Sequence, residues 1–318
     1  MKPPLSRRQF IRAAGLTGLV LPASGLIKAS GFSLLKQPPE ERREVHIFSK
    51  HLQWLNYKHM AEFAAECDFD GIDITVRPGG HVEPERAGTD LPEAVSTVRR
   101  TGKKVRMITT EIKRADEPHT RSILQTAGQL GIEYYRMGWY DYAPEATIGD
   151  NLEEIKRQLR DLAILSRQCN IKAAYQNHAG LGVGAPVWDI AQVLHGLDSP
   201  WIGCQYDIRH ATVEGGNSWP LAFDYVKPYI NSLDIKDFLW SEAAGKWIAT
   251  NVPLGQGMVD FDKYFSMIRS LPATVPMCLH VEYSLGGAEH GGKSITMSAA
   301  EVMKVMKADL DYIRRKTA

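Results

Sequence analysis

The stretch NLEEIKRQLRDLAILSRQCNIKAAYQNH, residues 151–178, joins an amphipathic segment to a short apolar run that ends on polar side chains. A helix over residues 150–168 is predicted because apolar residues recur there at helical spacing: Leu152, Ile155, Leu159, Leu162, Ala163 and Leu165. Residues 171–177 have the length and apolar character of a buried strand. Polar groups buried at its end need hydrogen-bond partners, from the fold or from a bound molecule.

The same strand and helix pattern recurs along the chain. Short apolar runs begin at residues 45, 71, 104, 132, 171, 201, 229 and 275. Helices are predicted at residues 54–67, 91–102, 118–130, 150–168, 186–196, 219–227, 260–270 and 298–315. Several apolar runs are continuous, which is typical of a parallel sheet covered by helices. Eight such units in one domain, residues 44–318, predict a (β/α)8 TIM barrel.

An open, doubly wound sheet is the alternative fold. It is disfavoured because no GxGxxG follows the first predicted strand. The glycine-rich segment GLGVGAP at 180–186 follows the fifth strand and lacks the lysine of a phosphate-binding loop.

The composition is that of a globular protein, with 44% hydrophobic and 24% charged residues. A net charge of +1 gives no support for nucleic-acid binding, and no run of 18 apolar residues predicts a stable membrane span. The four cysteines lie far apart without a CxxC pair, which favours buried thiols over disulfides or zinc: Cys67, Cys169, Cys204 and Cys278.

Residues 1–30 have the features of an export signal. Arg7 and Arg8 precede Gln9, Phe10 and a mildly apolar stretch that ends in small residues, which is typical of a twin-arginine signal. A disordered basic tail is the alternative. Residues 31–43 are charged and contain prolines, as a linker does. We therefore expect an exported, periplasmic protein.

Barrel enzymes place their chemistry at the C-terminal ends of the strands. Polar residues occur at every predicted strand end: Lys50, His51, Asp73, Arg77, Thr110, Glu111, Trp139, Asp141, Gln176, His178, Asp207, His210, Asp234, Lys236 and Glu282. Strand residues two apart share a face, so Gln176 points with His178 and Asp234 with Lys236. Carboxylates from different strands, with amide or imidazole groups, suit one divalent ion such as Mn²⁺, Mg²⁺ or Co²⁺.

At these strand ends the chain resembles the xylose isomerase-like TIM barrel superfamily, in its sugar phosphate isomerase/epimerase branch. The resemblance covers residues 44–316 and rests on the order of YQNH, YDIRH, DIKDF and HVEY, with VPLGQGMVDF at 252–261. It implies four metal ligands, at Gln176, Asp207, Asp234 and Glu282. Two positions depart from the family pattern, because Gln176 stands where a Glu is usual and Asp234 where a His or Gln is usual. Relatives often form dimers or tetramers, so a homo-oligomer is possible.

The departure at Gln176 bears on the reaction. An amide has no basic form near neutral pH, so a symmetrical epimerase with two opposed carboxylates is disfavoured. The remaining candidates for the catalytic acid and base are Glu282, His210, Lys236, His178 and Glu111. A metal ion that polarises a carbonyl acidifies the adjacent C–H, so one positioned base suffices for the first proton abstraction.

The expected substrate is a keto-sugar or a related carbohydrate, contacted by Trp139, His51, Arg77 and Trp240. The preferred activity is that of a metal-dependent isomerase or epimerase. A β-eliminating lyase or dehydratase acting on 3-keto-glycosides is the second hypothesis, since it shares the first step. A non-catalytic carbohydrate-binding barrel is the third, favoured by the two departures. An apurinic-site endonuclease, whose barrel is related, is disfavoured by the net charge and the export signal.

Overall fold

The computed structural model describes residues 42–197 and 200–317. Their eight parallel strands form one closed barrel in the order β1-β10-β7-β6-β5-β4-β3-β2. The strands are β1 Val45–Phe48, β2 Gly71–Thr75, β3 Lys104–Thr109, β4 Tyr134–Arg136, β5 Lys172–Gln176, β6 Ile202–Asp207, β7 Ile230–Ile235 and β10 Met277–Leu279. The predicted TIM barrel is therefore confirmed. The export signal expected at 1–30, and residues 31–41 of the linker, lie outside the described residues.

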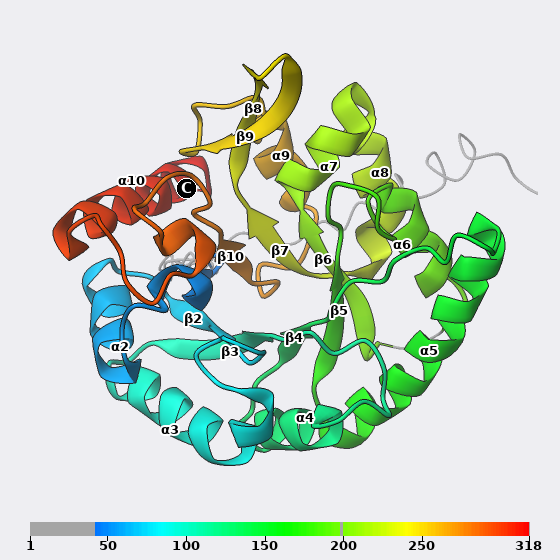
Figure 1. Cartoon of the computed structure of the whole chain (residues 1–318), viewed down its shortest axis with the longest axis horizontal. Coiled ribbons are helices and arrows are strands. Elements are labelled where there is room, and N and C mark those ends of the chain that lie inside the picture. The colour runs from blue at the N-terminus through cyan, green and yellow to red at the C-terminus, as the bar shows by residue number, and fades with distance from the viewer. Residues whose placement is uncertain (1–41, 198–199, 318) are drawn as a thin grey trace, which may run out of the picture. The chain divides into compact units, whose positions relative to one another are not determined.

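Helices surround the barrel (Figure 1), and all eight predicted ones are present within a few residues of their expected bounds. The nine helices of the described residues are α2 Tyr57–Glu66, α3 Ala87–Arg100, α4 Thr120–Gln129, α5 Ile148–Cys169, α6 Val187–Leu194, α7 Ile208–Gly215, α8 Trp219–Val226, α9 Phe261–Ile268 and α10 Ala299–Thr317. One of them, α7, is not predicted from the sequence. Single 3-10 turns lie at η1 Ser49–Leu52, η2 Pro84–Arg86, η3 Gly216–Ser218, η4 Lys227–Tyr229 and η5 Ala288–His290. Within the described ranges, no helix combines the length and apolarity needed to cross a membrane.

The segment that decides the fold has clear helix ends. Thr147 caps the N-terminus of α5 by accepting a hydrogen bond from the backbone N–H of Asp150. Asn170 ends the helix with a left-handed backbone, φ 55°, and β5 starts two residues later. The apolar stripe of α5 is buried against the barrel wall, as the helical spacing predicts.

The buried apolar side chains form two clusters. The large one lies between the strands and the surrounding helices. The small one lies inside the barrel and consists of four side chains from β1, β3, β4 and β10: Phe48, Met107, Tyr134 and Cys278. Register neighbours in a parallel sheet point to the same side, so Asp73, beside Phe48 and Met107, also faces inward. The interior is therefore largely polar, and its charged groups need partners.

An antiparallel hairpin interrupts the alternation after β7. Its strands are β8 Asp237–Ala243 and β9 Lys246–Val252, shown in yellow in Figure 1. At its base the Asp237 carboxylate accepts hydrogen bonds from the backbone N–H groups of Phe238, Gly255, Gly257 and Val259. A Cβ at position 257 would lie 2.2 Å from Asp237 Oδ1, so the GQG sequence allows this close approach.

The last helix is attached to two loops through Asp309. This carboxylate accepts hydrogen bonds from Leu254 N at 3.1 Å and from Tyr283 Oη at 2.8 Å. Burial raises the pKa of Asp309 to about 6, from the usual 3.8. Because the folded state holds this proton more tightly than the unfolded chain, the stability that Asp309 contributes falls as the pH rises through that window.

We expect Asp309→Asn to stabilise the fold by about 1–3 kcal/mol above pH 6. Asparagine carries no charge and can keep both contacts, because its Oδ1 accepts from Leu254 N and its Nδ2 can donate to Tyr283 Oη. The advantage disappears below about pH 4, where the aspartate is protonated in both states. Urea unfolding between pH 4 and pH 7 measures this difference, with Asp311→Asn on the same helix as the control. Parallel stability curves for the wild type and Asp309→Asn would contradict the prediction.

Candidate active site

Two lysines and two carboxylates meet at the C-terminal end of the barrel. Lys236 Nζ, just beyond β7, lies 3.2 Å from Asp207 Oδ2 at the end of β6 and 2.9 Å from Glu282 Oε2 beyond β10. Lys50 Nζ, in the turn after β1, lies 3.0 Å from Glu282 Oε1. Asp207 and Lys236 are buried, whereas the Glu282 and Lys50 side chains are each 20% exposed. The cluster is therefore in contact with solvent on the Glu282 side.

The charges in the cluster shift one another's ionisation. Burial alone would raise the pKa of Glu282, but Lys236 and Lys50 hold that pKa well below its usual range. Burial alone would likewise lower the pKa of Lys236, but Asp207 and Glu282 raise it. At neutral pH Glu282 is therefore a carboxylate and Lys236 an ammonium.

Gln176 connects the cluster to the barrel interior. Its Nε2 donates to Asp207 Oδ2 at 3.3 Å and to Asp234 Oδ2, while its Oε1 accepts from Arg136 Nη1 at 3.3 Å. Only this orientation works, because a flipped amide would place its oxygen against two carboxylates and its NH₂ against a guanidinium, which can only donate. Gln176 therefore presents N–H groups to the acidic residues.

Asn177, the polar residue that follows β5, has its hydrogen-bond partners in the backbone of Asp207. Its Nδ2 donates to the carbonyl of Asp207 at 2.9 Å, and its Oδ1 accepts from the Asp207 N–H at 2.7 Å. The Asp207 side chain in turn caps α7 by accepting from His210 N at 3.1 Å. This cap explains why a helix starts immediately after β6, and why Asp207 and His210 lie together as the sequence predicts.

His210 is buried and its tautomer is determined by its neighbour. Arg209 Nη1 lies 3.1 Å from His210 Nδ1, and a guanidinium can only donate, so Nδ1 is the acceptor. Burial lowers the pKa of His210 well below its usual value, so the neutral ring carries its proton on Nε2. That Nε2 lies 3.7 Å from Asp207 Oδ2 and has no hydrogen-bond partner. The ring can therefore donate a hydrogen bond through Nε2, and it has no free lone pair with which to act as a base.

An aromatic group borders His210. The exposed ring of His178 lies 4.0 Å from the ring of His210 and 4.6 Å from that of Trp139. The Arg136 guanidinium stands 4.6 Å from the Trp139 ring, and the buried Trp139 Nε1 has no partner. Trp139, the predicted substrate contact, and His178, a predicted catalytic residue, thus lie beside His210 at the edge of the charged cluster. The indole N–H of Trp139 is a free hydrogen-bond donor.

Other predicted contacts lie differently. His51 is buried, accepts from Val281 N at 3.0 Å through Nε2 and contacts the Ala288 carbonyl through Nδ1, so both ring nitrogens are used by the backbone. We therefore assign it a positioning role in place of the predicted substrate contact. Arg77 is partly buried over the Phe48 ring at 5.7 Å. Glu111 is exposed after β3, with no ion pair to the cluster among the described residues.

Trp240 lies on β8 and is 41% exposed. In the hairpin register it shares a face with Phe238 and Asn251. Asn251 Nδ2 lies 3.4 Å from the Glu282 carbonyl, and the Arg209 guanidinium lies 5.2 Å from the Phe238 ring. The face that carries Trp240 is therefore turned toward the cluster.

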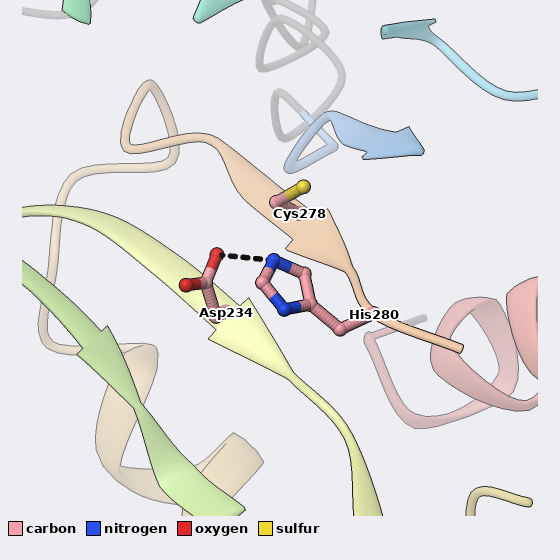
Figure 2. Close-up of side chains that lie close together, drawn as sticks. All are labelled: Asp234, Cys278 and His280. Carbon is pink, nitrogen blue, oxygen red and sulfur yellow. Dashed lines mark ion pairs between the residues drawn. The ribbon is translucent and has the colours of Figure 1, made fainter. Parts of the chain in front are cut away.

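A possible metal-ligand triad lies one layer deeper and combines the predicted ligand Asp234 with Cys278, for which the sequence predicts only a buried thiol, and with His280. Asp234, Cys278 and His280 offer ligand atoms within 4.8 Å of one another, and all three are buried. Figure 2 shows them on the adjacent strand ends of β7 and β10, with His280 Nε2 facing Asp234 Oδ1 at 3.4 Å. Burial raises the pKa of Asp234 to about 7. Cys278 Sγ contacts Asp73 at 3.6 Å, so these groups also serve one another as partners.

The sequence assigns no role to three residues that shape the site: Lys50, Arg136 and Gln205. Lys50 pairs with Glu282, Arg136 orients Gln176, and Gln205 Nε2 donates to Asp234 Oδ1 at 2.9 Å. Only their position in the sequence could have indicated these residues, because each lies within two residues of the C-terminal end of a strand.

A hollow of about 410 Å³ lies at the opposite end of the barrel, around Lys104, Arg106 and Glu133. Lys104 and Arg106 already have carboxylate partners, since Lys104 pairs with Glu44, and Arg106 with Glu44 and Glu133. The N-terminal end of a barrel serves stability, so the C-terminal cluster is the better candidate for catalysis.

Comparison with known proteins agrees with the fold. A family described as xylose isomerase-like TIM barrel matches residues 61–307. No curated protein is significantly similar to the chain in sequence.

Solved structures share the barrel at low sequence identity. D-psicose 3-epimerase from Clostridium cellulolyticum H10 superposes with a TM-score of 0.65 at 12% identity, covering 86% of this chain and 99% of its own. The 3-keto-D-glucoside 4-epimerase of E. coli gives a TM-score of 0.62 at 12% identity, covering 86% and 100%. A probable 3-DHS dehydratase from Bacillus anthracis gives 0.63 at 14% identity, covering 85% and 98%. At these identities the likeness shows a common fold.

Proposed function

Because the chain belongs to the xylose isomerase-like TIM barrel family, we propose that it is a sugar isomerase that moves a proton at the carbon next to a carbonyl. One observation carries the proposal. The ionised Glu282 carboxylate is held between the ammonium groups of Lys236 and Lys50, at the end of the barrel where catalytic residues lie. A base beside two cations is the arrangement that enolisation needs, because negative charge moves to the carbonyl oxygen as the proton leaves.

Each residue then has a defined task. Glu282 removes the proton from carbon and returns it to the adjacent carbon, and the hydroxyl proton of the enediolate moves from one of its two oxygens to the other. The substrate oxygen that becomes an enolate is stabilised by Lys236 and Lys50. His210 donates the hydrogen bond of Nε2–H to a substrate oxygen. The aromatic surface of Trp139 beside His178 supplies a face for the sugar ring.

A single base favours isomerisation over two-base epimerisation. Epimerisation by two opposed carboxylates would need a second base at the end of β5, where Gln176 stands with its NH₂ turned toward Asp207 and Asp234. One carboxylate suffices for a proton shift along one face of an enediol. The divalent ion expected from the sequence has no step in this scheme, because the donor atoms that would hold it are engaged by Lys236 and Arg136.

β-Elimination from a 3-keto-glycoside is the second candidate. It shares the first proton abstraction but also needs an acid for the departing oxygen. Glu282 carries a proton after the abstraction and can return it to the departing oxygen. The Nε2–H of neutral His210, beside Asp207, favours this candidate because it can donate a hydrogen bond to the same oxygen. The two reactions differ in product, since only elimination releases an aglycone.

The export expected from residues 1–30 is part of this proposal. Free sugar phosphates are scarce outside the cytoplasm, so we propose an unphosphorylated keto-sugar or 3-keto-glycoside as the substrate.

Incubation of the protein with ketohexoses and 3-keto-glucosides in D₂O tests the function. We expect deuterium at one carbon next to the carbonyl, observed by NMR, and none with Glu282→Gln. An isomerised sugar supports the first candidate and a released aglycone the second. No deuterium uptake and no product from any of these substrates would contradict both.

We expect Trp240→Ala to raise KM for 3-keto-glycosides roughly fivefold, with little change in kcat, because it removes about 1 kcal/mol of stacking. Steady-state kinetics measure the change. Leu239→Ala, on the opposite face of the hairpin, is the matched control. A fall in kcat with an unchanged KM for Trp240→Ala would place the tryptophan outside substrate binding.

A further inference from the structure

Lys236 occupies the position between two carboxylates that a bridging metal ion would take. Its Nζ lies 3.2 Å from Asp207 Oδ2 and 2.9 Å from Glu282 Oε2, and its side chain is 4% exposed. Divalent ions bind carboxylate oxygens at about 2.0–2.6 Å. An ion bridging these two oxygens would therefore have to displace the ammonium.

The remaining donors do not suit a metal ion either. Gln176 turns its NH₂ toward Asp207 and Asp234, and an amide binds a metal through its oxygen. That oxygen accepts from the buried guanidinium of Arg136. Asp234 accepts from Gln205 and Gln176, so both of its oxygens have donors.

The charges balance without an ion. Asp207 and Glu282 bring two negative charges, and Lys236 and Lys50 bring two positive ones within 3.2 Å. A divalent cation added to this arrangement would leave the cluster with excess positive charge at a largely buried site, which is unfavourable unless a lysine leaves.

We propose that the Lys236 ammonium is the resident cation of this site and takes the place of the divalent ion that the family resemblance implies. The binding part of this inference stands on geometry alone. Its catalytic consequence, that Lys236 and Lys50 stabilise the enolate oxygen without a metal ion, rests on the proposed function.

Titration with Mn²⁺ tests the inference without any substrate. After treatment with a chelator, the wild-type protein should show no Mn²⁺ binding by calorimetry or by electron paramagnetic resonance at up to millimolar Mn²⁺. Lys236→Ala leaves Asp207 and Glu282 without their shared ammonium, so we expect it to bind Mn²⁺ at least about tenfold more tightly than the wild type. The double variant Lys236→Ala with Asp207→Asn should lose this gain.

Two results would overturn the inference. One is stoichiometric Mn²⁺ in the wild type that is lost in Asp207→Asn. The other is an ion that survives Asp207→Asn but is lost in Cys278→Ser, since it would lie in the Asp234–Cys278–His280 triad and supply a cation other than Lys236. Both results are measured on the wild type and on single-site variants that keep Lys236, so they hold even if Lys236→Ala fails to fold.

The proposed function fails separately. A protein that neither binds Mn²⁺ nor exchanges deuterium would contradict the function and leave the resident lysine in place. A protein that exchanges deuterium only when Mn²⁺ is added would support the proposed function and contradict the inference that Lys236 is the resident cation.

Discussion

Glu282→Gln is expected to lower kcat/KM by about 10²- to 10⁴-fold, the usual contribution of a general base. The amide keeps the size of the side chain and can still accept from Lys236 or Lys50, but it cannot take a proton from carbon. KM should change little, because the substitution removes an interaction of the transition state. Initial rates, together with deuterium exchange into the substrate, measure both effects.

The exposed Asp141, which follows β4 at the same end of the barrel, provides the control. Asp141→Asn removes one negative charge from that end without touching the cluster. If Glu282→Gln kept more than a tenth of the wild-type rate, the base would have to be another residue.

Asp207→Ala is expected to destabilise the fold by about 4 kcal/mol, because a buried ion-pair partner and a helix cap are lost together. The Asp207 carboxylate pairs with Lys236, accepts from Gln176 and caps α7 through His210 N. Urea unfolding at pH 7 measures the loss.

Asp207→Asn separates the two contributions. Asparagine is as good a helix cap as aspartate, so this variant should cost about 1 kcal/mol less than the alanine. Equal losses in the two variants would mean that the cap adds nothing to stability, and no loss in either would contradict the buried pair.

The repeating pattern predicts the barrel because burial enforces it. Each strand is covered by a helix on the outside, so the apolar periodicity of segments such as residues 151–178 reports directly on the fold. The hairpin of β8 and β9 is missed for a physical reason. Its two-residue loop, Ala244 and Gly245, has positive φ at both positions, 50° and 73°, but alanine is not a residue that marks such a turn.

For the candidate site, sequence predicts location better than contacts. Strand ends bring Asp207, Lys236 and Glu282 to one edge because parallel strands all end there. Which atoms meet depends on side-chain reach and orientation, which no spacing rule contains. The long side chain of Lys236 spans two carboxylates, and the tautomer of His210 is set by Arg209.

The barrel also joins segments that are far apart in the chain. β1 pairs with β10, in a register that sets Val45 beside Met277, so the ring closes only after the last of its strands has been synthesised. Until then β1 presents an unpaired edge, which can associate with other chains. Non-local closure of this kind is slow, so we expect that shielding of that edge during synthesis matters more to the yield of the protein than the stability of the finished barrel.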